Sequence, residues 1–108
     1  MSGFKYLASP YSDSDPAVME QRFLMTEQAL NFLLRRKIWT YSPIVHCHAL
    51  ALKYNLPKDA AYWRDFDRTM IRASSGLILL KLAGWEISKG MAEEIAYAEE
   101  LGLPIEEL

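Results

Sequence analysis

The chain has 108 residues, of which 51% are hydrophobic and 24% charged, and its formal net charge is −2. This length fits a single domain, residues 1–108, with one hydrophobic core, and the near-neutral charge argues against a nucleic acid polymer as partner. The longest apolar run, Gly76 to Leu80, is stopped by Lys81 and is too short to span a bilayer, so we expect no membrane segment.

The compartment follows from two further observations. The N-terminus lacks the basic-then-apolar pattern of a signal peptide. The single cysteine, Cys47, cannot form an internal disulfide. Both observations predict a reduced, cytoplasmic protein.

The first predicted unit is a strand followed by a helix. The sequence FKYLA at residues 4–8 predicts a short strand, and SPYS at residues 9–12 predicts a polar turn after it. Asp15 followed by Pro16 is a helix start, because Asp is a good N-cap and Pro is tolerated at the first helical position. Apolar residues at helical spacing continue this helix to about Lys37.

A second unit begins with IWTY at residues 38–41, which predicts a strand that ends in the turn Ser42-Pro43. His46 and His48 follow, in a loop or the first turn of a helix. A His-x-His pair can bind a metal, but no carboxylate or cysteine lies at ligand spacing, so we predict no metal site. We expect His46 to contact a ligand at the mouth of a pocket.

A third helix is predicted from Asp59. Its apolar face carries Trp63, Phe66, Met70 and Ala73. Asp67 flanks this face, whereas Asp65 points elsewhere. Two interpretations of Asp67 remain open: a pocket residue, or a surface carboxylate paired with Arg64 or Arg68.

The segment GLILLKL at residues 76–82 is nearly all apolar, as in a central parallel strand buried on both faces, and a last short strand is predicted from Leu103. These elements predict an α/β fold: a small doubly wound, flavodoxin-like or Rossmann-like, parallel sheet of about four strands with helices on both faces. Ligand sites of such sheets lie beyond the carboxyl ends of the strands. The polar turns after the first two strands and the turn at residues 85–90 emerge there.

The last helix is predicted to begin near Ser88. One stripe at helical spacing carries Met91, Ile95, Ala98 and Leu101. Glu94 lies beside this stripe, whereas Glu93 is in line with Lys89, where a solvated ion pair is expected. Either Glu94 is an anionic nucleophile or base of a site, or it only offsets the helix dipole.

Three motifs together resemble the nucleoside 2-deoxyribosyltransferase-like superfamily, and in particular its small bacterial and phage members. They are YLASPY at residues 6–11, the segment 67–75 with Asp67, Ile71 and Ser74-Ser75, and the segment 88–98 with Ser88, Gly90 and Glu94. Their order and gaps match, and a Gly-Trp-x-x-Ser-x-Gly turn at residues 84–90 is shared as well. The resemblance covers most of the chain.

The resemblance implies catalytic roles for three residues. Glu94 matches the glutamate that attacks the anomeric carbon of a deoxyribose. Asp67 matches the aspartate that positions or protonates the departing base, and Tyr6 matches the tyrosine of the first strand. Such chemistry needs one carboxylate beneath the anomeric carbon and an acid for the leaving group. It implies no cofactor.

Two departures from the transferase pattern bear on the substrate. Position 88 is Ser, as in the related hydrolases of 2′-deoxynucleoside 5′-monophosphates, where transferases of free nucleosides carry Asp. The chain also ends just after the fourth predicted strand, without the C-terminal segment that completes the neighbouring site in transferases. We therefore expect an N-glycosidase of a nucleoside 5′-monophosphate, with a deoxyribosyltransferase or a non-catalytic nucleotide-binding module as alternatives.

The expected partner is accordingly a small-molecule nucleoside or nucleotide. The residues expected to bind it are Ser9, Tyr11, Ser12, His46, Trp85, Ser88, Lys89 and Gly90. Large apolar residues exceed what so small a core hides, and the family completes its sites across subunits, so a homodimer or larger homo-oligomer is expected. The apolar residues in question are Met25, Phe32, Trp39 and Trp63.

Overall fold

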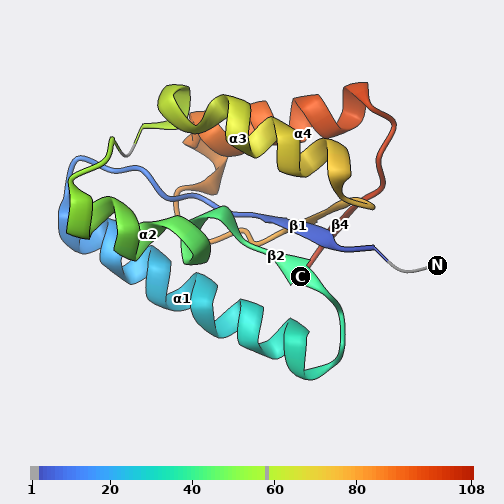
Figure 1. Cartoon of the computed structure of the whole chain (residues 1–108), viewed down its shortest axis with the longest axis horizontal. Coiled ribbons are helices and arrows are strands. Elements are labelled where there is room, and N and C mark those ends of the chain that lie inside the picture. Colours follow the sequence, from blue (N-terminus) through green and yellow to red (C-terminus); the bar gives the residue numbers. More distant parts are fainter. Residues whose placement is uncertain (1–2, 58) are drawn as a thin grey trace.

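The computed structural model describes residues 3–57 and 59–108 and has one four-stranded sheet between two pairs of helices (Figure 1). The strands are β1 (Lys5–Ala8), β2 (Thr40–Tyr41), β3 (Leu77–Leu79) and β4 (Ile105–Glu107). The helices are α1 (Pro16–Arg35), α2 (Pro43–Tyr54), α3 (Ala60–Ala73) and α4 (Lys89–Glu100), with a short 3₁₀ helix, η1 (Trp85–Ile87), before α4.

All strand pairs are parallel and the order across the sheet is β2-β1-β3-β4. The α/β class and the four parallel strands predicted from the sequence are thereby confirmed. The chain leaves β1 toward β2 on one side and later returns to β3 on the other. The point where the order reverses therefore lies between β1 and β3, which is where doubly wound sheets bind ligands.

The two faces of the sheet are covered by different helices. Alternation along β1 turns Tyr6 and Ala8 toward the face with α3 and α4, and Leu7 toward the face with α1. The first cluster adds Ile71, Leu77, Leu79, Met91 and Ala98, and the second adds Leu33 and Ile78. Both clusters meet at the two central strands, in which all residues except Lys5 are buried.

Local capping signals set the starts of three helices. The side chain of Asp15 accepts from the Ala17 N–H at 2.9 Å, and Pro16 is the first residue of α1. Ser42 caps α2 in the same way, with Oγ accepting from the Val45 N–H at 3.1 Å. Ser88 caps α4, as its spacing predicts.

The structure corrects the sequence-based elements in three places. Residues 43–54 form a full helix, where only a loop or a first helical turn was expected around the histidines. The second and third strands are shorter than the apolar runs that predicted them. Leu101, expected on the buried stripe of the last helix, is 42% exposed.

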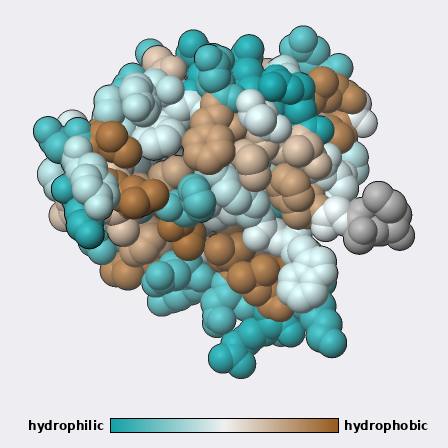
Figure 2. All heavy atoms as spheres, in the orientation of Figure 1, coloured by the Kyte–Doolittle hydropathy of each residue, from teal (hydrophilic) through white to brown (hydrophobic). Residues whose placement is uncertain are grey.

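Large apolar residues remain on the surface. Figure 2 shows hydrophobic residues over α1 and α2 on the face that is visible there. Those with the greatest exposure on α1 and the following loop include Leu24, Met25, Phe32 and Trp39. In the described part of the chain, no helix is long and apolar enough to cross a membrane.

Candidate active site

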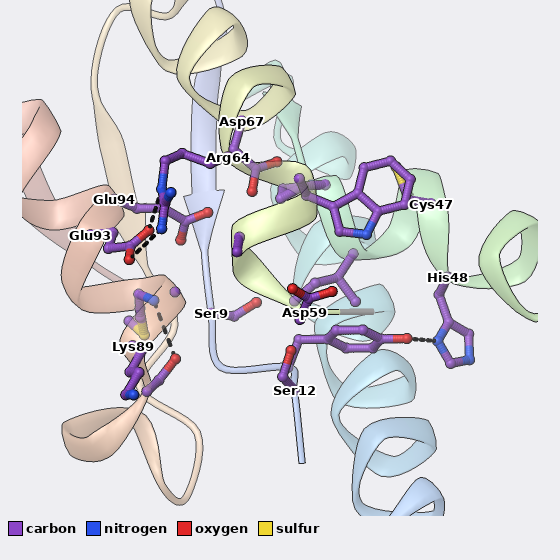
Figure 3. Close-up of a pocket in the computed structure, with 18 of the residues that line it drawn as sticks. Ser9, Ser12, Cys47, His48, Asp59, Arg64, Asp67, Lys89, Glu93 and Glu94 are labelled. Atoms are coloured by element: carbon purple, nitrogen blue, oxygen red, sulfur yellow. Dashed lines mark hydrogen bonds and ion pairs between the residues drawn. The ribbon is translucent and has the colours of Figure 1, made fainter. Parts of the chain in front are cut away.

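A cavity of about 670 Å³ opens beside the carboxyl ends of the central strands. It is lined by the loop after β1, by α2 and α3, and by the start of α4 (Figure 3). Its volume lies within the range of small-molecule sites. Of the residues predicted to form the site, the lining includes Ser9, Tyr11, Ser12, Asp67, Ser88, Lys89, Gly90 and Glu94.

Two carboxyl groups and a phenol converge at one wall of this cavity. Asp67 from α3 and Glu94 from α4 point into the same part of it (Figure 3). Tyr6, fully buried on β1, donates its hydroxyl hydrogen to Glu94 Oε2 at 2.5 Å. Three elements that are distant in sequence thus bring the three predicted catalytic residues together.

Burial changes the acidity of all three groups. Burial is the largest cause that raises the pKa of Glu94, which reaches about 8. The hydrogen bond from Tyr6 lowers this pKa, and the charge of Asp67 raises it. Burial also raises the pKa of Asp67 to about 6, and the nearby Tyr6 hydroxyl opposes this by lowering it. The pKa of the Tyr6 phenol lies well above its usual value, through burial and the two carboxylates. Near neutral pH the two carboxyls therefore hold one proton between them.

Glu93, the neighbour of Glu94, is in a different environment. Its carboxylate accepts two hydrogen bonds from Arg64 of α3, from Nε and Nη2, each at 3.1 Å. This pairing lowers the pKa of Glu93. The expected ion pair with Lys89 is replaced by this one because α3 packs alongside α4, which spacing along one helix cannot reveal. Arg64 is likewise not paired with Asp67, so the pocket interpretation of Asp67 is the one that the structure favours.

The start of α4 forms another wall. Ser88 Oγ accepts from the Met91 N–H at 3.2 Å, so Ser88 is the N-cap of this helix. Its hydroxyl hydrogen is not used by that bond. Lys89 and Gly90 line the cavity, and their N–H groups precede the first intrahelical hydrogen bond, from the Ala92 N–H to the Ser88 carbonyl oxygen. Such a helix start is favourable for anions.

At another wall, Tyr11 and His48 form a closed network. The Tyr11 hydroxyl lies 2.7 Å from His48 Nδ1, and Glu20 Oε1 lies 2.9 Å from Nε2. Phe23 stacks on the imidazole with ring centroids 4.2 Å apart. Both ring nitrogens of His48 are therefore occupied by protein groups.

Arg22 connects the two loops that flank the cavity. Its Nη1 donates to the carbonyl oxygens of Tyr11 and Ser12, and its Nη2 donates to that of Ala83 at 3.1 Å. Gly84 follows with a φ of 92°, and a Cβ there would approach Arg22 Nη2 to 2.6 Å. Glycine at this position thus allows both the left-handed turn and the close approach of the guanidinium.

Two predicted binding residues lie outside the cavity lining. His46 is exposed and contacts the rings of Tyr41 and Phe66 instead. Trp85 packs against the core cluster, with Lys81 Nζ 4.5 Å from its ring centroid. His48, rather than His46, is the histidine at the cavity.

Sequence reasoning missed several lining residues, and some of them had a signal. Ser42-Pro43 has the same cap-then-proline pattern as the start of α1, and a helix from there places Ile44, His48 and Ala51 on one buried face. Steps of four residues back from Asp67 lead to Trp63 and Asp59, which both line the cavity. Arg22 and Arg64 act through tertiary contacts, for which the sequence holds no local signal.

A family model described as a domain of unknown function (DUF1937) matches residues 3–108 of the chain. No curated protein matches the sequence of the chain. Within residues 3–57 and 59–108, no group of three or more His, Cys, Asp or Glu side chains is arranged to hold a metal ion.

Proposed function

Because the chain belongs to the DUF1937 family, whose description assigns no activity, we propose its function from the site: hydrolysis of the bond between base and sugar in a deoxynucleoside 5′-monophosphate. One observation carries the proposal. Two carboxyls with raised pKa values share a cavity, and a buried tyrosine donates to one of them. Cleavage of an N-glycosidic bond by this route requires a nucleophile and a general acid in the same site.

In the first step, a Glu94 oxygen attacks the anomeric carbon while the bond from that carbon to the base nitrogen breaks. The electron pair of the broken bond leaves with the base, which takes a proton from Asp67. The sugar becomes an ester of Glu94. The reactive form of the site thus has Glu94 ionised and Asp67 protonated, and the hydrogen bond from Tyr6 stabilises the ionised Glu94.

In the second step, water attacks the same carbon and gives its proton to Asp67. The ester bond breaks, Glu94 regains its negative charge, and the sugar phosphate leaves with a new hydroxyl. In the unliganded site the proton is held mainly by Glu94, whose pKa is the higher, so the reaction uses the less populated arrangement of that one proton.

The 5′-phosphate is proposed to bind at the start of α4. The Ser88 hydroxyl can donate to a phosphate oxygen while its own oxygen accepts the cap hydrogen bond. The first N–H groups of the helix and the ammonium of Lys89 supply further donors. Among the described residues, no carboxylate lies within ion-pair distance of Lys89.

The experiment that tests the function is a panel of deoxynucleosides and their 5′-monophosphates, incubated with and without a second free base. Release of base from monophosphates alone supports hydrolysis. A new nucleoside or nucleotide that forms only when an acceptor base is present would support deoxyribosyl transfer instead of hydrolysis. Binding without any product would leave a non-catalytic module.

We further propose that the exposed apolar surface of α1 and the loop after it packs against a second copy of the chain. Trp39 is 55% exposed and Phe32 43%, which is much apolar area for one surface of a small monomer. Sedimentation at micromolar concentration should show a dimer or larger assembly, and Trp39→Asp should shift it toward monomer. A parent protein that sediments as a monomer would contradict this assembly.

A further inference from the structure

One face of α3 runs along the cavity. Asp59, Trp63 and Asp67 all line it and follow one another at intervals of four residues. Each interval corresponds to about 6 Å along a helix axis. A ligand whose reacting carbon lies at Asp67 and Glu94 can therefore extend beside Trp63 toward Asp59.

Trp63 is held in a fixed orientation at the middle of this row. Its indole N–H donates to the Pro57 carbonyl oxygen at 2.7 Å, and Tyr62 packs edge-on with ring centroids 4.9 Å apart. The indole is only partly buried and lines the cavity. A fixed aromatic ring at a cavity wall is a suitable stacking surface for a flat heterocycle.

Asp59 is the available hydrogen-bond acceptor at the end of this row. In Figure 3 it lies across the cavity from Glu93 and Lys89. His48 has both nitrogens occupied, by Tyr11 and Glu20, and so cannot serve a ligand without breaking that network. Asp59 holds the N-cap position of α3 but makes no cap hydrogen bond, and among residues 3–57 and 59–108 its carboxylate has no partner.

We propose that this end of the cavity selects the base: Trp63 stacks on it and Asp59 accepts hydrogen bonds from an amino group at its edge. This inference rests on the proposed function and names its substrate class, the deoxynucleotides of adenine, cytosine and guanine in preference to those of thymine and uracil. The phosphate lies at the opposite side, at Ser88 and Lys89, away from the negative charge of Asp59.

The selection follows from donor and acceptor chemistry. A carboxylate offers only acceptors, so it pairs with the amino groups of adenine, cytosine and guanine. Thymine and uracil carry a single N–H between two carbonyl oxygens at the corresponding edge. Those oxygens face the carboxylate and are repelled by it. Stacking on Trp63 contributes to all bases, because every base has a π-face.

The test measures binding and so does not depend on turnover. Dissociation constants of the five deoxynucleoside 5′-monophosphates are determined by calorimetry on the Glu94→Gln protein, alone and combined with Asp59→Asn. Asp65→Asn is the matched control, since Asp65 lies on the same helix, is exposed and does not line the cavity. Retained melting temperatures show that each variant is folded.

We expect the three amino-bearing nucleotides to bind about tenfold tighter than the other two, as for a hydrogen bond to a charged group. Asp59→Asn should remove most of this preference and Asp65→Asn none of it. Trp63→Leu should weaken all five by about tenfold or more and leave their ratios unchanged.

Equal affinities for all five nucleotides, no binding of any, or a preference that survives Asp59→Asn would each overturn the inference. The proposed function fails separately. A preference that depends on Asp59, in a parent protein that releases no base from any of the five, would uphold the base site and reject hydrolysis. Base release by a parent protein that shows no binding preference among the five nucleotides would uphold hydrolysis and reject the base site.

Discussion

Two adjacent glutamates on α4 both line the cavity but have different partners. Glu93 is partly exposed, accepts two hydrogen bonds from Arg64, and has a lowered pKa. Glu94 faces the cavity, receives one hydrogen bond from Tyr6, and has a pKa raised to about 8. No cation lies within ion-pair distance of Glu94 among the described residues. A carboxylate that is paired with a cation is stabilised and inert, whereas one that is buried beside another acid can exchange protons and attack.

The largest expected effect comes from separating these two residues by mutation. Glu94→Gln keeps the shape of the side chain and removes the nucleophile, so base release should fall by on the order of a thousandfold or more. Glu93→Gln weakens a partly exposed ion pair with Arg64 at the cavity rim and leaves Glu94 in place, so the rate should stay within about twofold. Initial rates of base release from the monophosphates measure both. Equal losses from the two variants would show that the helix phase has been misassigned.

Asp67→Asn tests the second carboxyl of the site. Losing the proposed general acid should lower the rate by about a hundredfold, and more for bases that leave poorly without a proton. The rates are compared across bases of different leaving ability. Asp65→Asn is the matched control on the exposed face of α3. A loss that is uniform for all bases would remove Asp67 from the protonation step.

The pH dependence of kcat/KM tests the shared proton. Below about pH 6 both carboxyls are protonated and no nucleophile is present, and above about pH 8 both are ionised and no acid remains. The parent profile should therefore rise through about pH 6 and fall through about pH 8. This expectation is the same whichever of the two carboxyls carries the single proton between these pH values. Asp67→Asn should abolish the fall at high pH, because only ionisation of Glu94 is then required. A fall that persists in this variant would assign the acid to another group.

Ser88→Asp tests the phosphate end of the cavity. Aspartate is also a good N-cap, so the helix should keep its stability within about 1 kcal/mol. Its charge, however, repels a phosphate, and the preference of the site should move from a monophosphate toward the nucleoside by about tenfold. Affinities for one deoxynucleoside and its 5′-monophosphate provide the measurement. An unchanged preference would mean that Ser88 is only a cap.

A smaller effect concerns stability. The pKa of Glu94 is higher in the folded chain than the ordinary value of 4.5, so the folded state holds its proton more tightly than the unfolded state does. This contribution to stability is fully present below pH 4.5 and is lost as pH rises through about 8. Glu94→Gln should therefore melt at a higher temperature than the parent at pH 9, by a few degrees, with little difference at pH 4. Thermal unfolding followed by circular dichroism measures it, and a variant less stable at pH 9 would contradict the burial of this charge.

The sequence predicted those features that depend on local signals. Caps at Asp15, Asp59 and Ser88 marked three helix starts, and the phase of the last helix distinguished Glu94 from Glu93. The location of the candidate site could be predicted because parallel strands and their following loops meet at one edge of the sheet. The roles expected for Tyr6, Asp67 and Glu94 came from the family resemblance.

The remaining features depend on tertiary packing or on signals that were misinterpreted. The sequence placed Trp63 on the apolar face of its helix and among the residues that exceed the core, but not at the site, because apolar spacing cannot identify a cavity wall. The Arg64 and Glu93 pair joins two helices whose relative placement is absent from the sequence of either. His46 was preferred over His48 because the helix that buries one and exposes the other was not recognised at Ser42-Pro43.

The proposed reaction requires that Glu94 form a covalent bond to the sugar. It is tested most directly by acid-quenching the parent protein during turnover of a deoxynucleoside 5′-monophosphate, digesting it and measuring peptide masses. We predict that the peptide containing Glu94 gains the mass of one deoxyribose 5-phosphate less one water, with fragmentation assigning the ester to Glu94. The gain should be absent from Glu94→Gln and present in Glu93→Gln. An ester on Glu93 or Asp67, or base release that continues in Glu94→Gln at the parent rate, would contradict the account.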